Sequence, residues 1–106
     1  MQRVNLRDYL GGWLVGNFKP NLVQTEEFEF AVKYFKQGDQ EQRHYQVTAH
    51  ELSVVVTGSC RIGEVSMQAG EALLIEPGEI AGFEAFSDCS IAVVKWPSIP
   101  NDKVLA

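Results

Sequence analysis

A chain of 106 residues with 45% hydrophobic residues is long enough for one domain with one core and too short for two. Its net charge of −5, without a cluster of Lys and Arg, disfavours a nucleic-acid partner and a membrane partner, because both present phosphates that need neutralising. No run approaches the ~20 apolar residues of a transmembrane helix, and no signal peptide is recognisable, so we expect a cytoplasmic protein.

The first 26 residues carry little periodicity. Asn5 can cap a single turn over residues 7–10, which Gly11-Gly12 would end. A short apolar strand is predicted over residues 13–16. Its side chains must be buried against another part of the chain, so we expect this segment to lie across the outside of a sheet.

Residues 27–36 alternate most regularly and predict a long, half-buried strand. One face of this strand carries three aromatic residues, Phe28, Phe30 and Tyr34. We expect that face to line the interior, with Tyr34 best placed to present a hydroxyl group to a ligand.

Further strands are predicted over residues 42–47, 51–57, 71–76, 80–86 and 89–96, with a hairpin over 58–63 and a surface arm or short strand over 101–106. No helical periodicity extends beyond about two turns. Short strands at this spacing, separated by glycine-containing turns, are typical of an all-β sandwich or barrel.

The strongest candidate site lies on two of these strands. His44 and Gln46 are two residues apart, so both leave the same face of a strand, and Glu51 and Ser53 share a face in the same way. Neighbouring strands would aim these groups into one cavity. We expect Glu51 to pair with His44, because an inward carboxylate is costly without a partner, and the pair would be either structural or an acid–base couple.

Leu52, Val54 and Val56 would point away from this cavity. An apolar face of this kind needs a cover, which can be the N-terminal segment, another sheet or a second subunit, and we expect a homodimer. Cys60 and Cys89 are expected to be small apolar side chains rather than a disulfide.

The spacing Gly38-x5-His44-x-Gln46-x4-Glu51-x6-Gly58 resembles the first motif of the cupin superfamily, and residues 70–85 resemble the second. The wider chain looks like a group of small stand-alone cupins of largely unassigned function. This resemblance implies a single all-β domain over residues 1–106. It would be a cupin-type antiparallel β-barrel, or jelly roll, usually dimeric, with its pocket inside the barrel.

In cupins, two His, the Glu and a later His together bind one divalent metal. This chain keeps His44 and Glu51, while Gln46 and Ala81 stand at the other two positions. Two strong donors rarely hold a transition metal, so we expect no cofactor. If a divalent metal were bound, His44 and Glu51 would ligate it, joined by Gln46 or His50. His50 would need a bulge to reach it, because neighbouring residues on a strand point to opposite faces.

These observations favour a small cupin with a degenerate metal site that binds a small polar ligand in its barrel. The expected ligand-binding residues are His44, Gln46, Glu51, Ser53, Tyr34 and Phe83. Two alternatives stay open. One is an enzyme with His44 and Glu51 as catalytic candidates, either a metal-dependent oxygenase or isomerase or a metal-free isomerase. The other is a structural or interaction module with a closed barrel.

Overall fold

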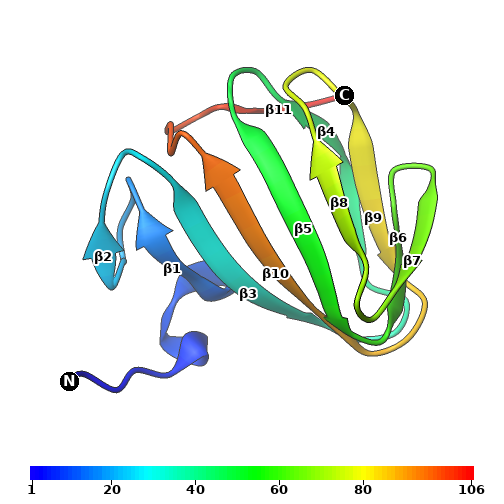
Figure 1. Ribbon diagram of the computed structural model, residues 1–106, viewed down its shortest axis with the longest axis horizontal. Helices are drawn as coiled ribbons and strands as arrows, with labels where there is room; N and C mark the ends of the chain where they lie inside the picture. The colour runs from blue at the N-terminus through cyan, green and yellow to red at the C-terminus, as the bar shows by residue number, and fades with distance from the viewer.

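Two β-sheets face each other in the computed structural model, which describes all 106 residues (Figure 1). The first sheet has six strands, in the spatial order β2 (Val23–Gln24), β1 (Trp13–Gly16), β3 (Glu29–Phe35), β10 (Cys89–Trp96), β5 (His50–Thr57) and β8 (Ala72–Ile75). The second has five, in the order β11 (Lys103–Leu105), β4 (Gln40–Gln46), β9 (Ala81–Ala85), β6 (Ser59–Ile62) and β7 (Val65–Gln68). All pairs are antiparallel except β1 with β2. The expected all-β jelly roll is confirmed.

Two local predictions are wrong. The hairpin expected over residues 58–63 is mostly strand β6, and its turn lies at Gly63-Glu64, where the chain enters β7. The segment expected to lie across a sheet instead extends one, because β1 pairs with β3 and Trp13 lines the cavity between the sheets. The first error misplaces a turn by a few residues, and the second arises because the pairing of β1 with β3 is not visible in the segment itself.

Strand β3 faces the opposite way from the prediction. Ala31 is fully buried, whereas 72% of the Tyr34 surface is exposed. The reason is the register with β10, in which Ala31 lies opposite Val93 and Lys33 lies opposite Ile91. Directly opposed residues of an antiparallel pair share a face, so the buried side chains of β10 turn Ala31, Lys33 and Phe35 inward. The expectation that Phe28, Phe30 and Tyr34 line the interior is therefore wrong.

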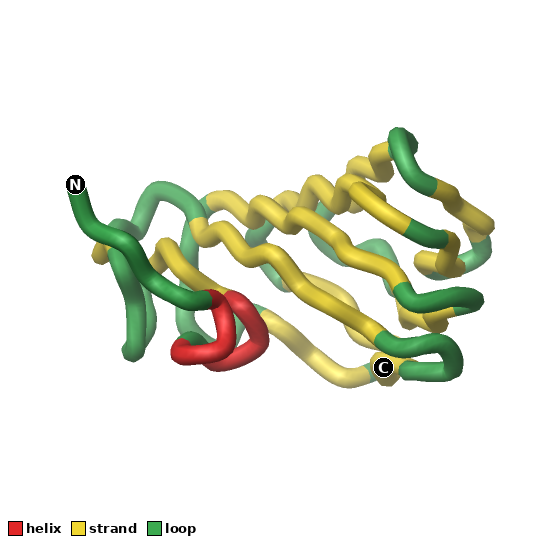
Figure 2. Tube along the Cα trace, turned by 90° about the horizontal axis from the view of Figure 1, so that it is seen from below, coloured by secondary structure: helices red, strands yellow, loops and turns green.

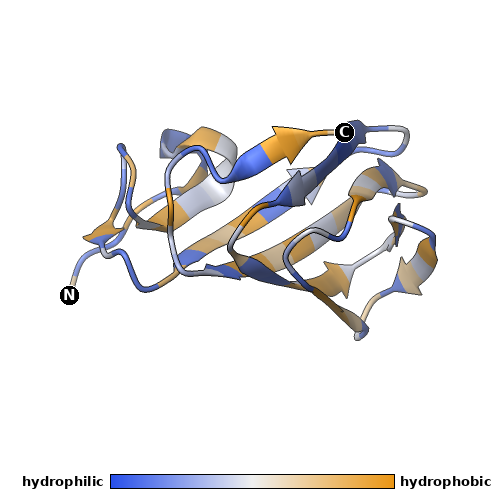
Figure 3. Ribbon diagram, turned by 90° about the horizontal axis from the view of Figure 1, so that it is seen from above, coloured by the Kyte–Doolittle hydropathy of each residue, from blue (hydrophilic) through white to orange (hydrophobic).

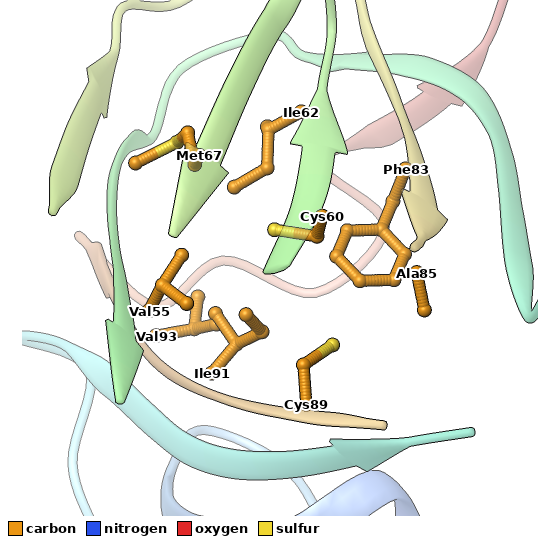
Figure 4. Close-up of a cluster of buried hydrophobic side chains, with 9 residues drawn as sticks. All are labelled: Val55, Cys60, Ile62, Met67, Phe83, Ala85, Cys89, Ile91 and Val93. Carbon is orange, nitrogen blue, oxygen red and sulfur yellow. The ribbon is translucent and has the colours of Figure 1, made fainter. Parts of the chain in front are cut away.

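The apolar core lies between the two sheets (Figure 4). Side chains of β5 and β10 point towards those of β6, β7 and β9 in a cluster of nine buried residues: Val55, Cys60, Ile62, Met67, Phe83, Ala85, Cys89, Ile91 and Val93. Both cysteines are free, in agreement with their predicted role as apolar side chains. Burial raises the pKa of the Cys60 thiol to about 11, so this group stays protonated at neutral pH.

The N-terminal segment packs beside β3 as two short 3₁₀ turns, η1 (Leu6–Asp8) and η2 (Leu10–Gly12) (Figure 2). The Asn5 side chain accepts a hydrogen bond from the Arg7 N–H and caps the first turn, as predicted. Gly12 approaches the β3 backbone so closely that a Cβ atom there would lie 2.0 Å from the Val32 carbonyl oxygen. No helix in the structure is long and apolar enough to span a membrane.

The outer face of the six-stranded sheet carries apolar side chains, as expected for residues 52, 54 and 56. Leu52 lies between Val94 and Leu74 in the register, and Figure 3 shows polar and apolar residues alternating along the strands. About half of the Val56 and Leu74 surfaces is exposed, at 53% and 52%. We expect the interface of the predicted homodimer to form on this face.

We expect the chain to be a homodimer that Leu74→Lys converts to a monomer, because a buried ammonium without a partner opposes association. Light scattering coupled to size-exclusion chromatography measures the change. Val47→Lys is the matched control, since Val47 is 57% exposed but follows β4 in the other sheet. A wild-type chain that runs as a monomer at high concentration would show the prediction to be wrong.

Candidate functional site

The interior of the barrel changes from apolar to charged along its strands. On β10 the inward residues run from Ile91 and Val93 to Lys95, and on the antiparallel strand β5 they run from Val55 through Ser53 to Glu51. Because Ile91 pairs with Val55 and Lys95 pairs with Glu51, the change occurs at the same level in both strands. The charged groups therefore gather at one end of the interior.

Two ion pairs lie in the interior of the barrel. Lys33 Nζ on β3 is 3.2 Å from Glu41 Oε2 on β4, which joins the two sheets, and Lys95 Nζ is 3.7 Å from Glu51 Oε1. The Trp13 ring lies beside both cations, with its centroid 5.4 Å from Lys33 Nζ and 5.1 Å from Lys95 Nζ. An aromatic face at this distance attracts a cation, so Trp13 helps to hold both lysines in place.

A bulge in β4 aims two residues into the same space. Glu41 pairs with Phe83 and His44 pairs with Ala81, so the two residues of β4 between these pairs lie opposite the single residue Gly82 of β9. On a regular strand, residues three apart point to opposite faces, but the bulge lets both Glu41 and His44 line the cavity.

His44 and Glu51 line the same cavity but do not pair, so the pairing expected between them is wrong. His44 Nδ1 lies 2.9 Å from the Gln42 carbonyl oxygen. A carbonyl can only accept, so Nδ1 carries a proton, and in the neutral ring this tautomer leaves Nε2 as an acceptor. Glu51 instead meets Lys95, its direct neighbour in the register, and accepts a 3.1 Å hydrogen bond from Ser53 Oγ.

The cavity between the sheets measures about 60 Å³ and is lined by both sheets. That volume has room for about four water-sized groups. Of the predicted ligand-binding residues, His44, Glu51, Ser53 and Phe83 line it, and Tyr34 does not. Phe83 is also part of the core, and the centroid of its ring lies 4.2 Å from the centroid of the Phe35 ring.

Gln46 lies beside this cavity in a separate space. It is 5% exposed, and its Nε2 atom is buried without a hydrogen-bond partner. A buried donor without an acceptor costs ~1–3 kcal/mol, so this amide is a candidate ligand contact. Gln46 borders a space of about 10 Å³ together with His44, Glu51 and Ala81.

Comparison with solved structures identifies the fold. An uncharacterized protein with a double-stranded β-helix domain from Klebsiella pneumoniae superposes with a TM-score of 0.70 at 19% identity, covering 77% of this chain and 72% of the other. An RmlC-like cupin from Desulfovibrio desulfuricans gives a TM-score of 0.64 at 21% identity, with 71% and 76% covered. This chain has the cupin fold.

An enzyme shares the cupin fold as well. Oxalate decarboxylase from Bacillus subtilis superposes with a TM-score of 0.67 at 15% identity, over 76% of this chain and 24% of the enzyme. No family model matches the sequence, and no curated protein is significantly similar to it. The cupin neighbours therefore establish the architecture, and the activity has to be argued from the site.

The metal expected of cupins does not fit the residues of this site. No group of three or more His, Cys, Asp or Glu side chains is placed so that it could hold a metal ion. Ala81 offers no donor opposite His44, and the Lys95 ammonium group is beside Glu51, where it would repel a cation. The space of about 10 Å³ bordered by the four corresponding residues is also about the size of one water.

His50 does not complete a metal site. Its Nδ1 atom is 2.6 Å from Glu76 Oε2, and its ring stacks on Trp96 with the centroids 5.5 Å apart. Its side chain therefore points away from the cavity, as expected for the residue before Glu51 on a regular strand.

Several residues of the site were missed from the sequence: Lys33, Glu41, Lys95 and Trp13. For Lys95 a signal was present, because it is the only charged residue in the apolar strand Cys89–Trp96. Lys33 was assigned to the wrong face together with the rest of β3. Glu41 reaches the cavity only through the bulge, which no residue pattern predicts.

Glu29 lies at the same end of the barrel, in a cavity that it shares with Gln46 and Lys95. Burial raises the pKa of its carboxyl group, although Lys95 and a hydrogen bond from Ser98 Oγ at 3.2 Å oppose the shift. The folded state thus favours the protonated acid. This contribution to stability is present at low pH and is lost as the pH rises through the raised pKa.

We expect Glu29→Gln to raise the melting temperature near pH 7.5 and to leave it almost unchanged near pH 4, where Glu29 is protonated. Glutamine keeps an oxygen for Ser98 and removes the charge. Thermal unfolding followed by circular dichroism at both pH values measures the difference. Glu27→Gln, at an exposed position of the same segment, is the control. An equal shift at both pH values would contradict this account.

Proposed function

We propose that this chain is a small-molecule-binding cupin domain that holds a small polar ligand at the charged end of its barrel, without a resident metal. The observation that carries the proposal is the pair of inward Lys–Glu contacts around a cavity of about 60 Å³. Replacing buried ion pairs by apolar residues is often neutral or stabilising. A barrel that served only as a scaffold would gain little from charges in this position.

Gln46 supports the same proposal. Its buried Nε2 atom has no acceptor, although most buried polar groups in folded proteins have a partner. Gln46 borders the neighbouring space of about 10 Å³ and not the cavity itself, so a water that the ligand orders would satisfy it. The site therefore favours a ligand that carries hydrogen-bond acceptors over an apolar one.

A second candidate function is a metal-independent enzyme, and His44 is the observation that favours it. The Gln42 carbonyl holds the proton on Nδ1, so Nε2 has a free electron pair and lines a cavity where a substrate proton could be removed. Oxalate decarboxylase, a structural neighbour, is an example of an enzyme on this fold.

The double variant Lys95→Met, Glu51→Leu tests the binding proposal. We expect its free energy of unfolding to change by no more than ~1 kcal/mol, because the two members of the ion pair are removed together, which offsets the loss of Lys95 beside Glu29 and of the acceptor for Ser53 Oγ. We expect ligand affinity to fall at least about tenfold. The measurement is a ¹H–¹⁵N NMR titration with a panel of acetate, glycine, glycerol and acetamide in buffer containing EDTA, together with urea unfolding.

For the wild type, at least one of these probes should shift the amide signals of Ser53 and Val93, which line the cavity. Shifts confined to surface residues, or no shifts at all, would contradict the proposal. Binding that requires added Zn²⁺ or Fe²⁺ would show that the metal-free part of the proposal is wrong.

If His44 acts as a base, a bound compound should exchange an acidic C–H hydrogen for deuterium in D₂O, and His44→Gln should abolish the exchange. Proton NMR of the compound follows the loss of signal without requiring a known product. His50→Gln is the control, because His50 points away from the cavity. Exchange that is equal in wild type and His44→Gln would contradict the enzyme alternative and leave binding as the function.

A further inference from the structure

The charged side chains that enter the interior come in matched pairs, Lys33 with Glu41 and Lys95 with Glu51. Lys103 also borders the cavity and has no carboxylate partner, but it is exposed to water, which screens its charge. The four side chains are largely withdrawn from water, with exposed fractions of 21% and 31% in the first pair and 13% and 14% in the second. A ligand with a single charge would bind one member of a pair and leave the other uncompensated, which is costly in a partly buried site.

A ligand that carries both charges avoids this penalty. Its carboxylate can accept hydrogen bonds from a lysine, and its ammonium group can donate to the glutamate that this lysine has left. The net charge of the site then stays the same, and every buried charge keeps a partner. We infer that the cavity is a site for a small zwitterion of the amino-acid class, an inference that rests on the binding function proposed above.

The Lys33–Glu41 pair is the one that opens to receive the zwitterion. It is the more exposed of the two pairs, and it joins the two sheets, whereas Lys95 and Glu51 are held side by side by the register of β10 and β5. Lys33 and Glu41 also line a second cavity of about 470 Å³ between β3 and the N-terminal turns. The pair therefore stands between this larger cavity and the interior.

The remaining groups suit a zwitterion. The Trp13 face, already occupied by two lysine ammonium groups, can hold the ligand's cation if Lys33 moves aside. His44 Nε2 is an acceptor for an ammonium N–H. The volume of about 60 Å³ admits the charged part of the ligand, and the larger cavity gives room for a longer side chain.

Three probes of similar size test the inference by NMR titration near pH 7.5, where the amino and carboxyl groups are both charged. Glycine carries both charges, propionate replaces the ammonium by a methyl group, and propylamine lacks the carboxylate. We expect glycine to bind the wild type at least about tenfold more tightly than either singly charged probe. The shifts should include the amide signals of Lys33 and Glu41.

Single substitutions of Glu41 and Lys33 should each remove the preference for glycine. The first should favour the anionic probe and the second the cationic probe. With Glu41→Gln, only the lysine charge remains, so propionate should bind at least as tightly as glycine. With Lys33→Met, only the glutamate charge of this pair remains, so propylamine should bind at least as tightly as glycine. If either single variant is poorly folded, the double variant Lys33→Met, Glu41→Leu leaves no unpaired charge, and it should lose the preference for glycine altogether.

Each outcome decides a different point. Wild-type propionate or propylamine binding as tight as that of glycine would overturn the zwitterion inference and leave the binding function standing. A glycine preference that persists in the double variant would overturn the assignment to Lys33 and Glu41. Failure of all three probes to bind, while glycerol or acetamide binds, would also overturn the inference alone. Failure of every probe to bind would overturn the inference and the binding function together.

Discussion

The register of β10 between β3 and β5 is the constraint on which the site depends. It sets Lys95 directly opposite Glu51 and Lys33 opposite Ile91, and so decides which charges enter the barrel. A shift of β10 by one residue would turn Lys95, together with Ile91 and Val93, to the outer face. The buried Ile91 and Val93 resist such a shift, because it would expose them to water. The apolar core therefore keeps the charged end of the cavity in position.

One feature separates the site from a metal centre. An ammonium group stands beside the carboxylate that the cupin motif supplies. The positive charge that a metal would provide is thus part of the chain itself. Lysine ammonium groups donate hydrogen bonds but form no coordination bonds, so Lys33 and Lys95 suit this cavity to ion pairing.

Much of the architecture could be predicted from local patterns. The motif spacing placed His44 and Glu51 in the interior, and the alternation of β5 placed Leu52 and Val54 outside. The alternation of β3 defined two faces but did not say which was buried. Its inner face combines Ala31, Lys33 and Phe35 and looks more polar than the outer face with Phe30 and Tyr34. Only the partner strand, about 60 residues further along the chain, decides between them.

The ring of His44 is oriented by a main-chain group, the Gln42 carbonyl oxygen in the bulge of β4. A single amino-acid replacement can delete a side chain, but it cannot delete a backbone carbonyl. The surrounding lysines, glutamates and aromatic rings can therefore drift during evolution while the imidazole keeps its direction. Such a cavity can acquire new ligands one replacement at a time, and its imidazole keeps its orientation for as long as His44 itself is retained.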